Sequence, residues 1–170
     1  LPFILLLSLS SLVAGLFAFL AFRAKRILPG GIAAFLIGFS VVIWSLCYLL
    51  EILVPSLPGK IFWANLKQIG NVLLPTATFI FALRYTHLAK TTRKWTIAIL
   101  TIEPSIVLIL YWVDGQTQLM RVNPQLYGLD GLSLLKFEFG QGLYIHFAYE
   151  AALTITSAIF FLIHLFKSES

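Results

Sequence analysis

Five ionisable side chains lie inside long apolar segments of this 170-residue sequence. They are Glu51, Lys67, Glu103, His146 and Glu150. Inserting such a group into the bilayer costs on the order of 3 kcal/mol of free energy unless the group finds a partner. Carboxylate, ammonium and imidazole groups can form ion pairs, relay protons or bind a polar ligand. We therefore expect all five to face the interior of a helix bundle and to find partners there.

The composition indicates that the segments holding these residues cross a membrane. The chain is 59% hydrophobic and 11% charged, whereas about a quarter of the residues in a soluble domain are charged. An apolar helix of about 20 residues spans a hydrocarbon core of roughly 30 Å. The sequence predicts an all-α membrane protein, a polytopic transmembrane helix bundle that forms a single domain over 1–170. The predicted spans are about 1–22, 32–54, 60–87, 95–113 and 140–166.

The long connection 114–139 is predicted to form an extracytoplasmic β-hairpin. Lys136 and Glu138 alternate with Phe137 and Phe139, which is the period of a strand. Basic residues in short loops favour the cytoplasmic side of a membrane. They gather in the first and third connections, as Arg23, Lys25, Arg26, Lys90, Arg93 and Lys94. The N-terminus, the second connection and the hairpin are therefore predicted to lie outside.

The depth of each ionisable residue follows from the helical rise of 1.5 Å per residue. Lys67 and His146 should lie about 10 Å and 9 Å below the outer ends of their helices, and Glu103 and Glu150 roughly 15 Å below. Glu51 should lie close to the outer end of its own helix. All five would then share the outer half of the bilayer.

Two interpretations of this arrangement remain open. In one, a pocket open to the outside has Glu103 and Glu150 as its floor and aromatic side chains around its mouth. In the other, buried pairs hold four helices in register. The candidate ligand-binding residues are Glu51, Trp63, Lys67, Asn71, Glu103, Trp112, His146, Tyr149 and Glu150. Pro75 and Pro104 either kink their helices or free main-chain carbonyls that polar neighbours use.

Metal, cofactor and catalytic chemistry are not expected. His146 and Glu150, four residues apart, could offer two metal ligands, but a helical metal site needs further His or carboxylate partners. No phosphate-binding glycine loop, zinc-protease motif, nucleophile elbow or kinase signature occurs in the sequence. The net charge of +5 comes from residues at helix ends, so we predict contact with the lipid bilayer and not with nucleic acid.

Several short motifs resemble a known family when they are taken together. Segment two ends with Trp44…Tyr48-x-x-Glu51, and segment four contains Glu103-Pro104. Segment three carries Phe62-Trp63…Leu66…Gly70…Pro75…Phe79…Phe81-Ala82-Leu83…Tyr85, and segment five opens with residues 142–149, GLYIHFAY. From segment two to segment five, the chain resembles the N-terminal seven-helix membrane region of bacterial histidine kinases.

The resemblance implies a place in bacterial signal transduction. It implies a bacterial inner-membrane protein whose membrane region is followed, in the same polypeptide, by a cytoplasmic histidine kinase, PAS or diguanylate cyclase module. It also implies a homodimer. Five predicted spans, where the family has seven, suggest a truncated membrane region.

The function we predict is a sensory input domain without catalytic activity. An unknown ligand or physical stimulus would act on the polar interior, and helix shifts would carry the change across the membrane. The alternative is a fragment of a transporter or proton path, which intramembrane carboxylates and proline-broken helices would also suit. A retinal photoreceptor is a third possibility, but Lys67 lies in the third span and not in a final helix.

Overall fold

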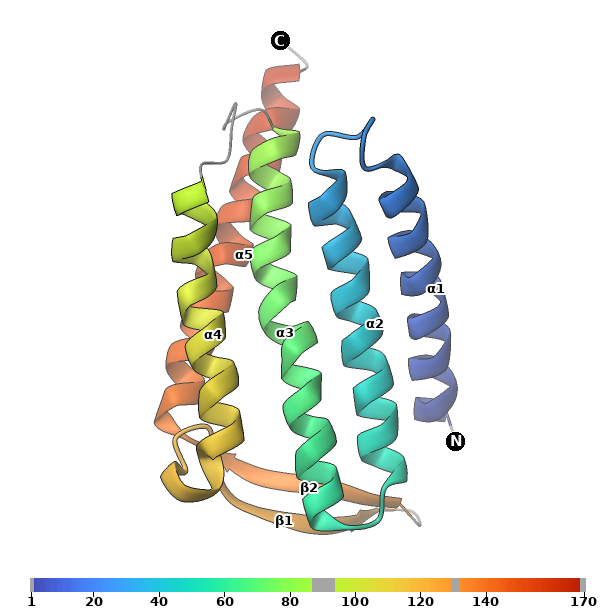
Figure 1. Cartoon of the computed structure of the whole chain (residues 1–170), viewed down its shortest axis with the longest axis vertical. Helices are drawn as coiled ribbons and strands as arrows, with labels where there is room; N and C mark the ends of the chain where they lie inside the picture. Colours follow the sequence, from blue (N-terminus) through green and yellow to red (C-terminus); the bar gives the residue numbers. More distant parts are fainter. Residues whose placement is uncertain (1, 87–93, 130–131, 169–170) are drawn as a thin grey trace.

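The computed structural model describes residues 2–86, 94–129 and 132–168. These residues form five long helices and one two-stranded antiparallel sheet (Figure 1). The helices are α1 (Pro2–Ala24), α2 (Gly31–Leu53), α3 (Leu57–Tyr85), α4 (Lys94–Thr117) and α5 (Gln141–Ser168), and the strands are β1 (Arg121–Leu129) and β2 (Leu132–Phe139).

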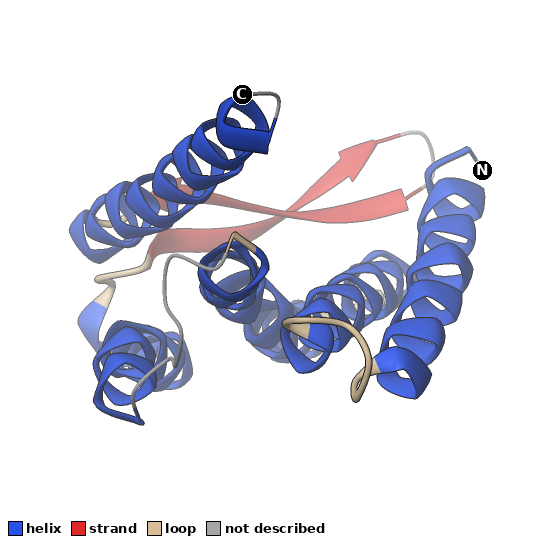
Figure 2. Ribbon diagram, turned by 90° about the horizontal axis from the view of Figure 1, so that it is seen from above, coloured by secondary structure: helices blue, strands red, loops and turns tan. Residues whose placement is uncertain are grey.

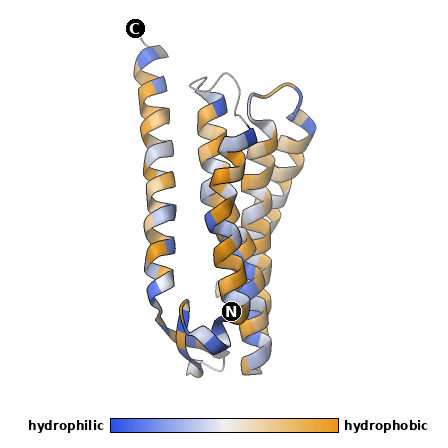
Figure 3. Cartoon of the chain, turned by 60° about the vertical axis from the view of Figure 1, so that its left-hand side comes forward, coloured by the Kyte–Doolittle hydropathy of each residue, from blue (hydrophilic) through white to orange (hydrophobic). Residues whose placement is uncertain are grey.

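All five predicted spans are helices long and apolar enough to cross a membrane. Many large apolar side chains on α1, α4 and α5 are exposed, as expected for surfaces that face lipid. Figure 3 shows hydrophobic residues along the helices and polar residues gathered at the hairpin. The prediction of an all-α membrane bundle with a hairpin loop is therefore confirmed.

The observed helix ends differ from the predicted ones by a few residues. Helix α3 begins three residues before the predicted start, because the Ser56 hydroxyl accepts a hydrogen bond from the Gly59 N–H and caps the first turn. Helix α4 continues four residues beyond the predicted end and takes in Asp114, whose carboxylate has hydrogen-bond partners in the chain that follows. The predicted end of segment three at His87, together with Lys90 and Arg93 used for orientation, lies outside the described residues.

Helices α1, α2 and α3 form a row, and both α4 and α5 lie beside α3 (Figure 2). The contact between α2 and α3 is the most extensive, whereas α4 and α5 touch each other at few points. The α2–α3 contact is close because Gly70 of α3 faces the backbone of α2 near Ser40 and Trp44. Small residues allow membrane helices to approach in this way.

The hairpin lies across one end of the bundle, the same end as the N-terminus, and the C-terminus lies at the opposite end (Figure 1). In the ladder, Arg121 pairs with Phe139 and Gln125 with Lys136, with an irregularity between Val122 and Gln125. A cluster of buried side chains anchors the hairpin to three helices. It consists of Val72 of α3, Val107 and Tyr111 of α4, Met120, and Leu143 of α5. This cluster fixes the hairpin ends of α3, α4 and α5 relative to one another.

Candidate functional site

The predicted ionisable residues form two groups, and the first joins α2 to α3. The Lys67 Nζ atom lies 2.5 Å from Oε2 of Glu51, and the two side chains are 16% and 8% exposed. The same ammonium lies 4.3 Å from the centre of the Tyr48 ring. A carboxylate and an aromatic face therefore both stabilise the Lys67 charge.

Lys60, in the first turn of α3, contacts the end of α2 beside this first group. Sequence alone placed it at the edge of a loop, but its side chain is completely buried. Its Nζ atom donates to the main-chain oxygens of Glu51, at 2.6 Å, and Ile52, at 3.2 Å. These carbonyls are in the last turn of α2, where no further N–H of the helix reaches them. A cation at this position also interacts favourably with the helix dipole.

The second group joins α4 to α5 through an imidazole. His146 is 1% exposed, and its Nδ1 atom lies 2.8 Å from Oε1 of Glu103 on α4. Its Nε2 atom lies 3.1 Å from Oε1 of Glu150, one turn further along α5, without the alignment of a hydrogen bond. Oε2 of Glu103 is buried and has no hydrogen-bond partner among the described residues. The group thus links two helices that otherwise touch little.

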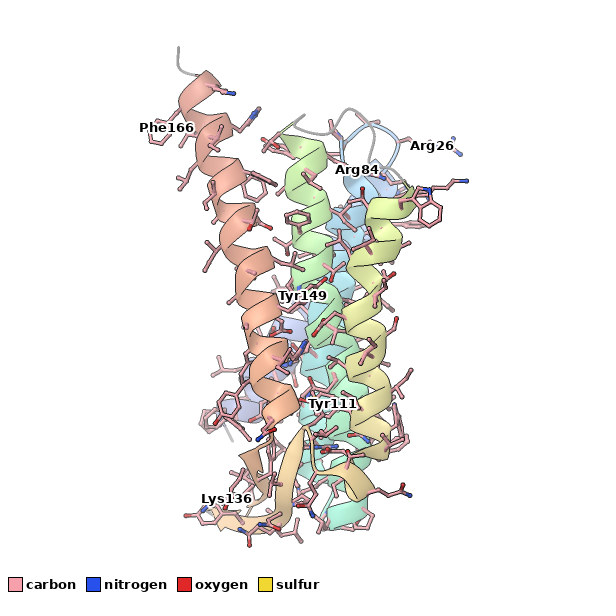
Figure 4. All side chains as sticks on the ribbon, turned by 90° about the vertical axis from the view of Figure 1, so that its left-hand side faces the viewer. Arg26, Arg84, Tyr111, Lys136, Tyr149 and Phe166 are labelled. Atoms are coloured by element: carbon pink, nitrogen blue, oxygen red, sulfur yellow. The ribbon has the colours of Figure 1, made fainter. Side chains whose placement is uncertain are left out.

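Tyr149 adds a second link between α4 and α5. Its hydroxyl donates to the Leu100 main-chain oxygen at 2.9 Å. Leu100 precedes Pro104 by four residues, and proline has no N–H to donate to that oxygen. Of the two roles that the sequence left open for Pro104, the structure shows the second: a polar neighbour uses the carbonyl that the proline frees. Figure 4 shows Tyr149 midway along the bundle, with Tyr111 nearer the hairpin.

Asn71 lies on α3 where two cavities meet. One cavity, of about 310 Å³, lies between α3 and α5 and is lined by Asn71, Pro75, Thr78 and Glu150, among others. The other, of about 340 Å³, lies between α2 and α3. The Asn71 side-chain amide donates to Oε1 of Gln68 at 2.9 Å. Because Pro75 has no N–H, the main-chain oxygen of Asn71 lacks its usual helical donor, so the first cavity has both carboxylate and carbonyl acceptors nearby.

Trp63 and Trp112, the two tryptophans among the predicted ligand-binding residues, lie closer to the hairpin than Asn71 does. Trp63 packs edge-on against Phe62, with ring centres 5.3 Å apart, and Phe62 packs edge-on against Trp112 at 5.9 Å. Trp112 also lines a third cavity, of about 250 Å³, between α3, α4 and the start of the hairpin. The aromatic residues therefore connect α3 to α4 beside this third cavity.

Sequence reasoning missed the polar group beside the third cavity. The Asp114 carboxylate accepts hydrogen bonds from the main-chain N–H groups of Met120 and Arg121, at 2.8 Å and 2.7 Å. The Arg121 guanidinium donates to Oδ1 of Asn65 on α3. In the sequence, Asp114 ends an apolar run and Arg121 stands alone in the connection that follows. Their opposite charges were the available signal. Nothing in the local sequence indicated that the two residues meet as a buried pair.

The nine predicted ligand-binding residues thus form several separate groups in the structure. Glu103, His146, Tyr149 and Glu150 connect α4 to α5, and Glu150 shares a cavity with Asn71. Glu51 and Lys67 form a pair of their own, and Trp63 and Trp112 both pack against Phe62. The expectation that each ionisable group has a partner is confirmed, whereas ligand binding by these residues stays a prediction.

The Glu51–Lys67 pair should contribute to stability as a unit. Each of Glu51→Gln and Lys67→Met should lower the free energy of unfolding by about 2 kcal/mol, because each leaves a partly buried charge without its partner. The double variant should lose less than the sum of the two. Unfolding titrations in mixed detergent micelles measure the three values. Additive losses would show that the two charges do not interact energetically.

The described residues contain five membrane-length helices, with ionic links between α2 and α3 and between α4 and α5, and a hairpin covers one end (Figure 1). These features define a polytopic membrane protein with polar groups between its helices. A comparison with family models matches residues 6–170 to the N-terminal 7TM region of histidine kinase. The chain belongs to this family. No curated protein and no solved structure gave a significant match. The family match over 6–170 therefore identifies the chain as a transmembrane sensory region of the histidine kinase type.

Proposed function

We propose that the stimulus of this sensory region acts on the cavity between α3 and α5. The observation that supports the proposal is the position of Glu150. It lines the cavity, and its Oε1 atom also lies 3.1 Å from Nε2 of His146, whose other ring nitrogen is bonded to Glu103 on α4. A ligand that takes a hydrogen bond or charge interaction from Glu150 would compete with the α4–α5 link.

The output of this competition would be a shift of α5 against α4. A ligand changes the populations of two helix arrangements only if it binds one of them more tightly. In the arrangement described here, His146 bridges Glu103 and Glu150. In the second arrangement, Glu150 would turn toward the ligand and His146 would keep Glu103 alone. Small shifts of packed helices are a common form of signal transfer.

The wider setting of the proposal follows from the family and from the distribution of charge. We place the hairpin and the N-terminus outside a bacterial inner membrane, because basic residues gather at the opposite end of the helices. The family region has seven transmembrane helices, and the described residues contain five of membrane length. In this proposal, 1–170 is one domain, completed by two further helices and a cytoplasmic output module of the same polypeptide, which acts as a homodimer.

Replacing Glu150 with glutamine should change the signalling output of the full-length kinase. The neutral amide keeps the size of the side chain but loses the charge that faces His146. We expect basal autophosphorylation in native membrane vesicles to shift by about fivefold or more, since coupling between sites of 1–3 kcal/mol corresponds to such factors. The matched control is Glu138→Gln, the same change at an exposed hairpin position.

The experiment separates signalling from folding by measuring membrane insertion of each variant. Equal insertion together with equal basal output and equal stimulus response for Glu150→Gln and wild type would contradict the proposal. Ion or solute flux through the purified protein in liposomes would instead support the transporter alternative. The family match favours sensing. A proton path would need polar groups such as the hydroxyls of Thr78 and Ser157, but these hydroxyls donate their hydrogens to carbonyls of their own helices.

A further inference from the structure

One side of α3 is left open between α2 and α5. The cavities of about 310 Å³ and 340 Å³ adjoin there, because both are lined by Asn71 and Leu74, and one continues to α5 whereas the other continues to α2. Helices α2 and α5 have no extensive contact with each other, so they do not close over this side. We call it the α3 groove. Its lining residues are Ser40, Val41 and Trp44 of α2, Gly70, Asn71, Leu74, Pro75 and Thr78 of α3, and Glu150 and Thr154 of α5.

The lining of the α3 groove is partly apolar and partly polar. Val41, Trp44 and Leu74 supply apolar surface, whereas Thr154 is exposed and the Glu150 side chain is 22% exposed. Lipid tails cannot solvate a carboxylate, and water alone leaves the apolar surface uncovered. The outer strip of α4 differs, since it exposes only isoleucines at helical spacing: Ile99, Ile102, Ile106 and Ile109. A membrane helix that carries a few polar residues therefore suits the groove better than lipid does.

The hairpin extends across one end of the α3 groove. Strand β2 contacts both α2 and α3, and Figure 2 shows the hairpin on the side of α3 that lies between α5 and α1. Strand β1 has nine residues, so its length is roughly 30 Å at about 3.3 Å per residue. A helix with its side chains is about 10 Å wide. The hairpin is thus long enough to cover the end of α3 together with the ends of two helices beside it.

The direction of α5 determines where a following helix begins. Helix α5 runs from the hairpin to the opposite end of the bundle (Figure 1). The family region has seven transmembrane helices, and the described residues contain five of membrane length. A sixth helix would start where α5 ends and lie next to it, because consecutive elements are usually adjacent. His146 and Tyr149 already face α4, whereas the face of α5 with Thr154 borders the groove.

We propose that the two further transmembrane helices of this family region pack into the α3 groove, the sixth against α5 and the seventh against α2. The proposal rests on the proposed function for the presence of these helices in the same polypeptide. Their position joins α2 to α5 and places both helices under the hairpin. The cavity beside Glu150 then lies inside a closed bundle, so a signal received there acts directly on the helices that lead to the output module.

Two neighbouring positions on α5 test whether the groove is filled. Thr154 lines the groove, whereas Ile155 is 60% exposed and points about 100° further around the helix at nearly the same depth. Each is replaced by cysteine and spin-labelled in the full-length kinase in lipid nanodiscs, with all other cysteines, including Cys47, replaced by alanine. Collisions with oxygen dissolved in the bilayer should be at least about threefold less frequent at Thr154→Cys, since packed helices exclude oxygen. Equal collision rates would show lipid in the groove and overturn the proposal.

Photo-crosslinking identifies what fills the groove. A benzophenone amino acid in place of Leu74 should form an adduct with the segment that follows residue 170, as located by mass spectrometry. The same group in place of Ile102, which is 56% exposed on α4, should react with lipid. An adduct of the Leu74 position with lipid or with a second copy would overturn the proposal, and the oxygen rates decide if no adduct forms. Wild-type signalling by Glu150→Gln would contradict the proposed function and leave these results unchanged, so the two proposals fail separately.

Discussion

Replacing Gly70 with alanine is expected to force α2 and α3 apart and to lower the free energy of unfolding by about 3 kcal/mol. A Cβ atom at this position would lie 2.4 Å from the main-chain oxygen of Ser40 and 2.9 Å from the main-chain nitrogen of Trp44. Both neighbours are backbone atoms of a helix, so they cannot move without moving α2. The α2–α3 contact is the most extensive in the bundle, so the strain falls on its main interface.

The same change at Gly15 provides the control. Gly15 is also in a membrane helix and also faces α2, but its added Cβ would lie 3.8 Å from a side-chain atom of Val42, an ordinary contact distance. Gly15→Ala should therefore change the free energy of unfolding by less than about 0.5 kcal/mol. Unfolding titrations in mixed micelles measure both variants. Equal stabilities would show that the α2–α3 interface tolerates a wider separation than the structure indicates.

Replacing Asp114 with alanine is expected to detach the hairpin and to cost about 4 kcal/mol. The carboxylate accepts two main-chain hydrogen bonds, from Met120 and Arg121, and it neutralises the Arg121 guanidinium. Without it, a charge that is 4% exposed loses its ionic partner and two buried N–H groups lose their acceptor. Limited proteolysis should then cleave the 118–140 region faster than in the wild type, and the unfolding titration should show the loss of stability.

Two further variants show whether the charge or the hydrogen bonds matter more. Asp114→Asn keeps one carbonyl acceptor and should lose less stability than Asp114→Ala. Glu138→Ala removes a carboxylate from an exposed position in the same hairpin and should be nearly neutral. If Asp114→Ala behaved like Glu138→Ala, the buried pair would have no role in holding the hairpin.

The regular elements could be read from the sequence because they depend on local properties. The length of each apolar run determines whether a helix can cross a membrane, and the alternation around Lys136 and Glu138 is sufficient to indicate a strand. One of the two roles left open for Pro104 follows from its chemistry, since a proline inside a helix always leaves the carbonyl four residues earlier without its helical donor. The sequence did not reveal that Tyr149 supplies the missing donor.

The sequence by itself determined that the charged residues within the helices need partners, because an isolated charge in lipid is costly. The tertiary structure alone decided the pairing: Lys67 with Glu51, His146 with Glu103 and Glu150, and the unforeseen Asp114 with Arg121. Pairing depends on how each helix is rotated about its axis and how closely it approaches its neighbour. Those quantities arise from interhelical packing and from the docking of the hairpin, which join residues far apart in the chain and leave no mark in the local sequence.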